Sequence, residues 1–251
     1  MRVGVYAAAL LGLLPVAAGA DGASDLARRL QALRAPGPVA ATLRLELRLE
    51  RTLHRTTVNG QASVHLDVEE DDRGTHVHWE PAVLRAANEE ERKHDASPDR
   101  LLPLREALKE LDPVRLDHLL DQAATIAGLA KGPPAEEAAE SYEGREARRL
   151  TYRFQPRLSW TDAYYVRHRE GRFTLWIAPD GTPIASESLA SFDGKTSRMF
   201  GRFKGTTRVS TRYAAEDGRL RVAERDVDEA DSREDGAEAE HTVRQFLLER
   251  R

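Results

Sequence analysis

The sequence predicts a mainly β protein of the α+β class, in which about nine antiparallel strands form one curled sheet with helices on one side. Apolar and polar side chains alternate through residues 39–53, hairpin signals punctuate the second half of the chain, and residues 97–130 follow a helical period. A strand of that length spans about 50 Å, and strands so long belong to strongly twisted sheets. We therefore expect a curled sheet with one apolar face that needs a cover.

Residues 1–20 have the pattern of a cleaved leader. Arg2 supplies the positive start, residues 5–16 are apolar, and Ala18-Gly19-Ala20 is a small-x-small cleavage site. The apolar run is shorter than the roughly 20 residues that a membrane-spanning helix needs. We expect a single mature domain, residues 21–251, that is secreted and soluble in a bacterial periplasm.

Composition limits the classes of partner and of chemistry. The formal net charge is −4 at pH 7, whereas a nucleic-acid-binding protein needs a basic face. The chain has no Cys, and it carries no Gly-x-Ser-x-Gly, His-Glu-x-x-His or glycine-rich phosphate-binding motif. We expect a protein that is not an enzyme, uses no cofactor and binds no nucleic acid.

The first third of the chain predicts a helix followed by a meander. Residues 25–33 place leucines at helical spacing after Ser24, the expected N-cap, and Pro36-Gly37-Pro38 ends this helix. In residues 39–53 every odd position is apolar except Arg51. Asn59-Gly60 predicts a two-residue hairpin turn that places Leu53 opposite Leu66. The apolar face then gains the even positions of the second strand, and a third strand ends near Trp79, after a turn in residues 69–74.

The middle of the chain predicts helices, and the remainder predicts strands. Leucines recur at helical spacing in residues 101–111, and Asp112-Pro113 starts a second helix that ends near residue 131. We expect these helices to cover the apolar sheet face. After a polar, glutamate-rich loop, the expected strands are residues 145–154, 172–177, 183–192, 200–213, 220–227 and 240–248. Residues 228–239 are acidic and are expected to form a loop.

This order of elements resembles the LolA/LolB-like superfamily of periplasmic lipoprotein carriers. Residues 144–154 and the segment Leu175-Trp176-Ile177-Ala178-Pro179-Asp180-Gly181-Thr182-Pro183 are similar to that superfamily's strand and hairpin. The resemblance implies an incomplete β-barrel, or half-barrel, with a helical lid inserted after the third strand, over a hydrophobic cavity. The early proline-glycine segment of the carriers is not intact here, where only Trp79-Glu80-Pro81 is found.

The expected function is to hold a lipid, an acyl chain or a lipoprotein between the sheet and the lid, with transient membrane contact. Burial at about 0.8 kcal/mol per methylene could hold an acyl chain without any polar motif. The expected ligand-binding residues are Leu43, Leu45, Leu47, Leu49, Arg51, Leu53, Leu66 and Trp79 on the sheet and Leu116, Leu119, Leu120 and Ile126 on the lid. In the carriers an inner-face arginine latches the lid. Arg51 has that position, although an arginine near a strand end also extends its charge to water.

Two alternatives stay open. The same fold with a filled core could be an interaction or sensor module that binds an envelope protein. The predicted registers also place His54 opposite His65, and His65 opposite His78 with His76 nearby, on the polar face. Such a row could bind Zn²⁺ or Cu²⁺, or form a solvated, pH-responsive patch. Trp160, Tyr164 and Tyr165 either rim a cavity mouth or pack on the core edge.

Overall fold

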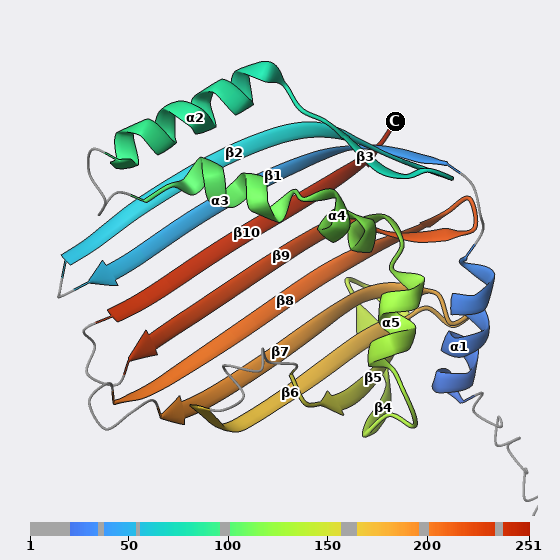
Figure 1. The fold of residues 1–251 in the computed structure, drawn as a ribbon. Coiled ribbons are helices and arrows are strands. Elements are labelled where there is room, and N and C mark those ends of the chain that lie inside the picture. Colours follow the sequence, from blue (N-terminus) through green and yellow to red (C-terminus); the bar gives the residue numbers. More distant parts are fainter. Residues whose placement is uncertain are drawn as a thin grey trace, which may run out of the picture.

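A single antiparallel sheet dominates the molecule (Figure 1). The computed structural model describes residues 21–34, 38–53, 56–95, 101–156, 165–195, 201–233 and 238–251. Within them, ten strands form one unclosed sheet in the order β3-β2-β1-β10-β9-β8-β7-β6-β5-β4. The mainly β, antiparallel class expected from the sequence is therefore confirmed, with ten strands where about nine were predicted.

The strands and helices have the following bounds. The strands are β1 (Val39–Leu53), β2 (Thr56–Asp71), β3 (Gly74–His78), β4 (Glu136–Tyr142), β5 (Arg145–Phe154), β6 (Val166–Ile177), β7 (Pro183–Lys195), β8 (Arg202–Glu216), β9 (Arg219–Arg233) and β10 (Glu238–Arg250). The helices are α1 (Gly22–Ala32), α2 (Pro81–Asp95), α3 (Pro103–Glu110), α4 (Pro113–Leu120) and α5 (Ala123–Leu129). None of these helices combines the length and the apolar composition that crossing a membrane requires.

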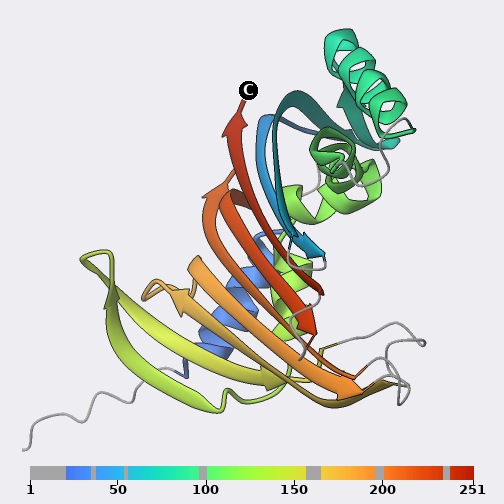
Figure 2. The ribbon, with the colours of Figure 1, turned by 90° about the vertical axis from the view of Figure 1, so that its left-hand side faces the viewer.

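The helices pack on one face of the sheet and form two separate cores with it. Figure 2 shows that the sheet is strongly curved and that α3, α4 and α5 lie on its concave side. Leucines of β1 and β2 pack with residues of α3 and α4 and with Val222, Val227, Phe246 and Leu248 in a first core. Leucines of α1 and residues of α5 pack on β5 and β6 in a second core.

Polar contacts tie helix α1 to the β6–β7 side of the sheet. Asp25 in α1 forms an ion pair with Arg148 of β5 at 2.6 Å, and Arg29 donates a hydrogen bond to Thr182 at 2.7 Å. Gly181 has a φ of +87°, and a Cβ there would overlap the backbone of Asp25, so the turn approaches the helix closely. The N-cap of α1 is Asp21, whose side chain accepts from Ala23 N, and the prediction of Ser24 was wrong.

The predicted register of the first hairpin was wrong. Leu53 faces Thr56 and Val39 faces Glu70, so the pairing of β1 with β2 is not centred on Asn59-Gly60. The true register differs from the predicted one by an even number of positions. Because side chains alternate between faces, the odd residues of β1 still share their face with Val64 and Leu66 of β2.

Asn59 and Gly60 lie inside β2 and do not form a turn. A Cβ built on Gly60 would be 3.2 Å from Pro103 Cγ and 3.4 Å from Leu101 Cβ. The glycine therefore lets the start of α3 approach the sheet closely. Close approach of another segment is one reason for a glycine inside a strand. The Asn-Gly pair is a frequent hairpin signal, but here close packing explains the glycine.

Other segments also differ from the prediction, among them helix α2, which was not expected. The glutamate-rich segment expected to be a loop forms the edge strand β4, which pairs with β5. The expected acidic loop over residues 228–239 is mostly strand, because β9 continues to Arg233 and β10 begins at Glu238. The single helix expected after Pro113 is divided into α4 and α5 at Asp121 and Gln122, where Gln122 N donates to Leu220 O of β9.

Candidate functional site

The leucine face that was expected to line a ligand cavity is filled by side chains. Leu43, Leu45 and Leu47 are at most 1% exposed, and Leu49 and Leu66 are at most 9% exposed. They pack with Leu116, Leu119 and Leu120 of α4 in the first core, and Trp79 packs against its margin. Ile126 belongs to the second core. Of the twelve residues expected to bind a ligand, Arg51 and Leu53 lie at a separate pocket at the strand ends.

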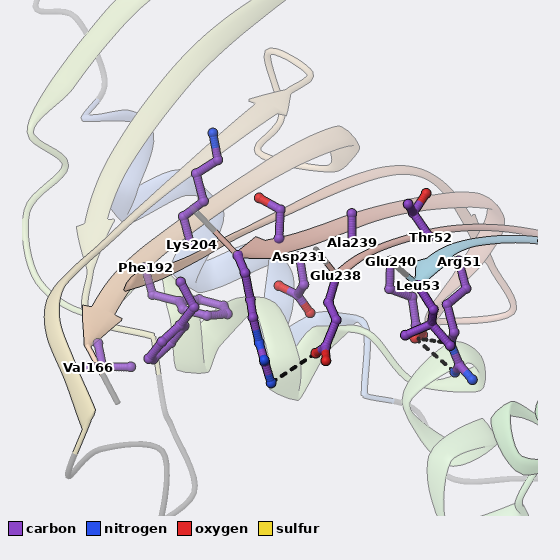
Figure 3. A pocket seen from close by; sticks show the side chains of 13 residues that line it. Arg51, Thr52, Leu53, Val166, Phe192, Lys204, Asp231, Glu238, Ala239 and Glu240 are labelled. Atoms are coloured by element: carbon purple, nitrogen blue, oxygen red, sulfur yellow. Dashed lines mark hydrogen bonds and ion pairs between the residues drawn. The ribbon is translucent and has the colours of Figure 1, made fainter. Parts of the chain in front are cut away.

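This strand-end pocket has a volume of about 630 Å³, within the roughly 300–1,000 Å³ of ordinary ligand sites (Figure 3). Five strands and the start of β6 contribute to it. The lining residues are Arg51, Thr52, Leu53, Val166, Phe192, Phe203, Lys204, Asp231, Ser232, Arg233, Glu238, Ala239 and Glu240. Strand order explains the assembly, because β10 lies between β1 and β9 and brings residues near 50 and 240 side by side.

Two phenylalanine–glycine pairs form the apolar floor of the pocket. Phe192 faces Gly205 across β7 and β8, and Gly194 faces Phe203. A Cβ at Gly205 would overlap the ring of Phe192, and a Cβ at Gly194 would overlap the ring of Phe203. Each ring therefore lies across the glycine of the neighbouring strand, with ring centroids 6.2 Å apart and planes at 60°. Leu53 and Val166 extend this apolar surface.

Two ion pairs form the polar side of the pocket. Arg51 Nη2 lies 2.9 Å from Glu240 Oε2, and Arg233 Nη2 lies 2.9 Å from Glu238 Oε2. The side chains of Arg51 and Glu240 are both close to half exposed, and such pairs contribute only about 0–1 kcal/mol to stability. Arg51 thus bonds to the neighbouring strand β10, not to a helix as the carrier resemblance implied.

Asp231 is the carboxyl group with the most distinctive surroundings in the pocket. It faces Gly205 across β8 and β9, on the same side as Phe192. Asp231 is exposed as a whole residue, but incomplete hydration of its carboxyl group and the nearby carboxylates of Glu229 and Glu240 raise its pKa above the ordinary value. Among the described residues, its side chain has neither a hydrogen bond nor an ion pair.

Two smaller hollows adjoin the strand-end pocket. One, of about 270 Å³, shares Arg51 and Glu240 with it and extends beneath the start of α3, where Leu47, Leu49 and Leu101 contribute to its wall. The other, of about 550 Å³, shares Val166 and Phe192 with it and is mostly polar. The strand-end pocket therefore lies between a partly apolar hollow near the helices and a polar hollow at the start of β6.

The predicted histidine row is not assembled as expected. His65 faces Arg44, and His78 faces Asp67, because both hairpin registers differ from the prediction. His76 Nε2 lies 3.1 Å from Asp71, and His78 Nε2 lies 3.7 Å from Glu69. In the part of the chain that the structure describes, no three His, Asp or Glu side chains form a metal-binding group. His54 lies outside the described residues.

The structure describes only part of the predicted aromatic loop and none of the predicted leader. Trp160 and Tyr164 lie outside the described residues, and so do residues 1–20 with the expected cleavage site. Tyr165 is 43% exposed, and its backbone oxygen approaches Gly194 at the edge of the pocket floor.

Sequence reasoning missed Phe192, Phe203 and Asp231. One signal was present: Phe192-Asp193-Gly194 and Phe203-Lys204-Gly205 repeat the pattern phenylalanine-x-glycine, although the first expected strand ended at Phe192 and Asp193-Gly194 was expected to turn, whereas β7 continues to Lys195. Residues two apart share a strand face, so each repeat places a phenylalanine ring and a glycine without a side chain on one face. The antiparallel register then places each ring opposite the glycine of the other strand. For Asp231 the sequence offers no comparable signal, because it lies within a run of acidic residues.

Comparison of the chain with models of protein families, with curated proteins and with solved structures found no match. The relationship to the lipoprotein carriers therefore stays a prediction from the sequence.

Proposed function

We propose that this protein is a periplasmic, non-enzymatic carrier or binding protein that holds a lipid, an acyl chain or the acyl group of a lipoprotein in the strand-end pocket. The observation that carries the proposal is the apolar floor, where Phe192 and Phe203 lie across Gly205 and Gly194 in a pocket of about 630 Å³. The ligand thus lies beyond the packed leucine face, and the helices serve as a lid over the remainder of the concave surface.

Apolar burial is the main source of free energy for such binding. Ten buried methylenes contribute about 8 kcal/mol at roughly 0.8 kcal/mol each. This gain exceeds only the lower part of the association cost of about 4–15 kcal/mol, so net binding requires a site that is already formed. The paired rings and glycines provide a preformed site, because the backbone of β7 and β8 fixes both rings by its register.

A second candidate is an interaction module with a filled core that binds an envelope protein. The packing of Leu45, Leu116 and Leu120, each at most 1% exposed, favours it, because no ligand is needed to fill the sheet–helix interface. In that case the strand-end pocket holds no acyl chain.

The two candidates predict different results with the purified chain. A carrier releases lipid on organic-solvent extraction, detected by mass spectrometry, and takes up a fluorescent fatty acid saturably. We expect Phe192→Ala to weaken that uptake at least about tenfold, because it removes much of the apolar floor. Leu189→Ala, on the opposite face of β7, is the matched control and leaves the affinity unchanged. Absence of both lipid and saturable uptake supports the interaction module.

A further inference from the structure

The charges on the concave face around the strand-end pocket are balanced except at Asp231. Glu240 pairs with Arg51, Glu238 pairs with Arg233, and Glu229 accepts a hydrogen bond from Arg244 at 2.6 Å. Lys204 lines the pocket but belongs to the other side of the strands, and Figure 3 shows its side chain directed away from Asp231. Asp231 is thus the acidic group of this face that no described cation compensates.

The Asp231 carboxylate also lies beside an aromatic ring. A Cβ built on Gly205 would overlap both Asp231 Oδ1 and Phe192 Cζ, so the carboxylate and the ring meet above this glycine. Phe203 adds a second ring at 6.2 Å from the first. An unpaired carboxylate beside aromatic rings suits an organic cation, because the carboxylate attracts the cation by its charge and a ring face attracts it by its quadrupole.

We propose that the strand-end pocket selects ligands whose apolar chain ends in an ammonium group, held by Asp231 and the rings of Phe192 and Phe203. This inference rests on the proposed function, since the same pocket holds the apolar chain. Leu53 and Val166 contact that chain, and the ammonium group replaces the missing partner of Asp231. Free alkylamines and lipids with an ammonium head group share this chemistry.

The neighbouring hollow does not favour an anionic head group. It carries Arg167 and Arg169, but Glu170 and Asp193 lie in the same lining and balance their charge. Arg169 also donates to the backbone oxygen of Pro156 at 3.3 Å. The uncompensated charge nearest the apolar floor is therefore negative.

Calorimetric titration with probes of equal chain length tests the inference. The probes are decyltrimethylammonium, decyl maltoside and decanoate, each kept below its micelle concentration. We expect the ammonium probe to bind at least about tenfold more tightly than the uncharged one, a difference of about 1.4 kcal/mol. Asp231→Asn removes this advantage and leaves decyl maltoside binding unchanged, which also shows that the pocket is intact. Asp226→Asn, on the opposite face of β9, is the control and keeps the advantage.

The possible results separate the two proposals. If decyl maltoside binds but the ammonium probe has no advantage, or decanoate binds most tightly, this inference is overturned and the proposed function stands. If no probe binds, both fail. If the ammonium probe has the expected advantage, lysophosphatidylcholine distinguishes the source of the head group. Weaker binding of lysophosphatidylcholine by Asp231→Asn assigns a lipid, and weaker binding of decyltrimethylammonium alone assigns a free alkylammonium ion.

Discussion

Glycines at positions 194 and 205 determine how closely two phenylalanine rings lie on the sheet. Glycine within a strand normally weakens it, since it has no side chain to pack and loses more backbone freedom on folding. Here the rings of Phe192 and Phe203 occupy the space that two Cβ atoms would need. The cost of the glycines is thus offset by ring packing, and the same arrangement forms the pocket floor.

Replacing Gly205 tests this arrangement. We expect Gly205→Ala to lower the free energy of unfolding by about 1 kcal/mol, because the Phe192 ring and the Asp231 carboxylate must move aside for the new Cβ. Urea denaturation measures the change. Gly128 in α5 has nothing within 4 Å of a built Cβ, so Gly128→Ala should stabilise the protein by up to about 1 kcal/mol. Equal effects of the two substitutions would show that the rings do not lie across the glycines.

At the scale of elements, alternation predicts the face of a residue more securely than its partner. The odd positions of β1 were assigned to the buried face correctly, although the hairpin was centred on Asn59-Gly60 in error. A shift by an even number of positions leaves every side chain on its face, so the apolar pattern cannot detect it. The partners of His65 depend on the register itself, and for that reason the histidine row was wrong.

Elements without a buried face were the ones that the sequence did not predict. Helix α2 has no buried residue, and the edge strand β4 has none either. Neither can show a strong apolar period, because one side of each has no core to meet. Glutamates along β4 are also what an exposed sheet edge needs to resist pairing with another chain. Such elements can be assigned only from the elements that they pack against or pair with in the structure.

The burial of Leu45 of β1 in the first core makes a prediction that separates core from site. We expect Leu45→Ala to lower the free energy of unfolding by about 2–5 kcal/mol, because it leaves a cavity beside a side chain that is 0% exposed. The affinity of the folded protein for a fluorescent fatty acid should not change. Leu84→Ala in α2, where the side chain is 43% exposed, should change stability by less than about 0.5 kcal/mol. If Leu45→Ala weakens binding without loss of stability, the ligand binds at the leucine face and not at the strand ends.

For the whole molecule, the fold class followed from the sequence and most of the site did not. The pocket combines residues near positions 50, 166, 192, 203, 231 and 240. Their meeting depends on β10 lying between β1 and β9, a pairing between the two ends of the chain. Local periodicity contains no information on such distant pairing. It therefore identified Arg51 and Leu53 through their strand, and it could not select Phe203 or Asp231.

Photocrosslinking tests the central claim, that the apolar ligand lies at the strand ends and not between the leucines and helices. The purified chain is irradiated with a fatty acid that carries a diazirine near its chain end, and labelled peptides are identified by mass spectrometry. We predict labels on the strand-end residues Leu53, Phe192 and Phe203, removed by excess unlabelled fatty acid. Competed labels on Leu45, Leu66 and Leu116 instead would contradict the account.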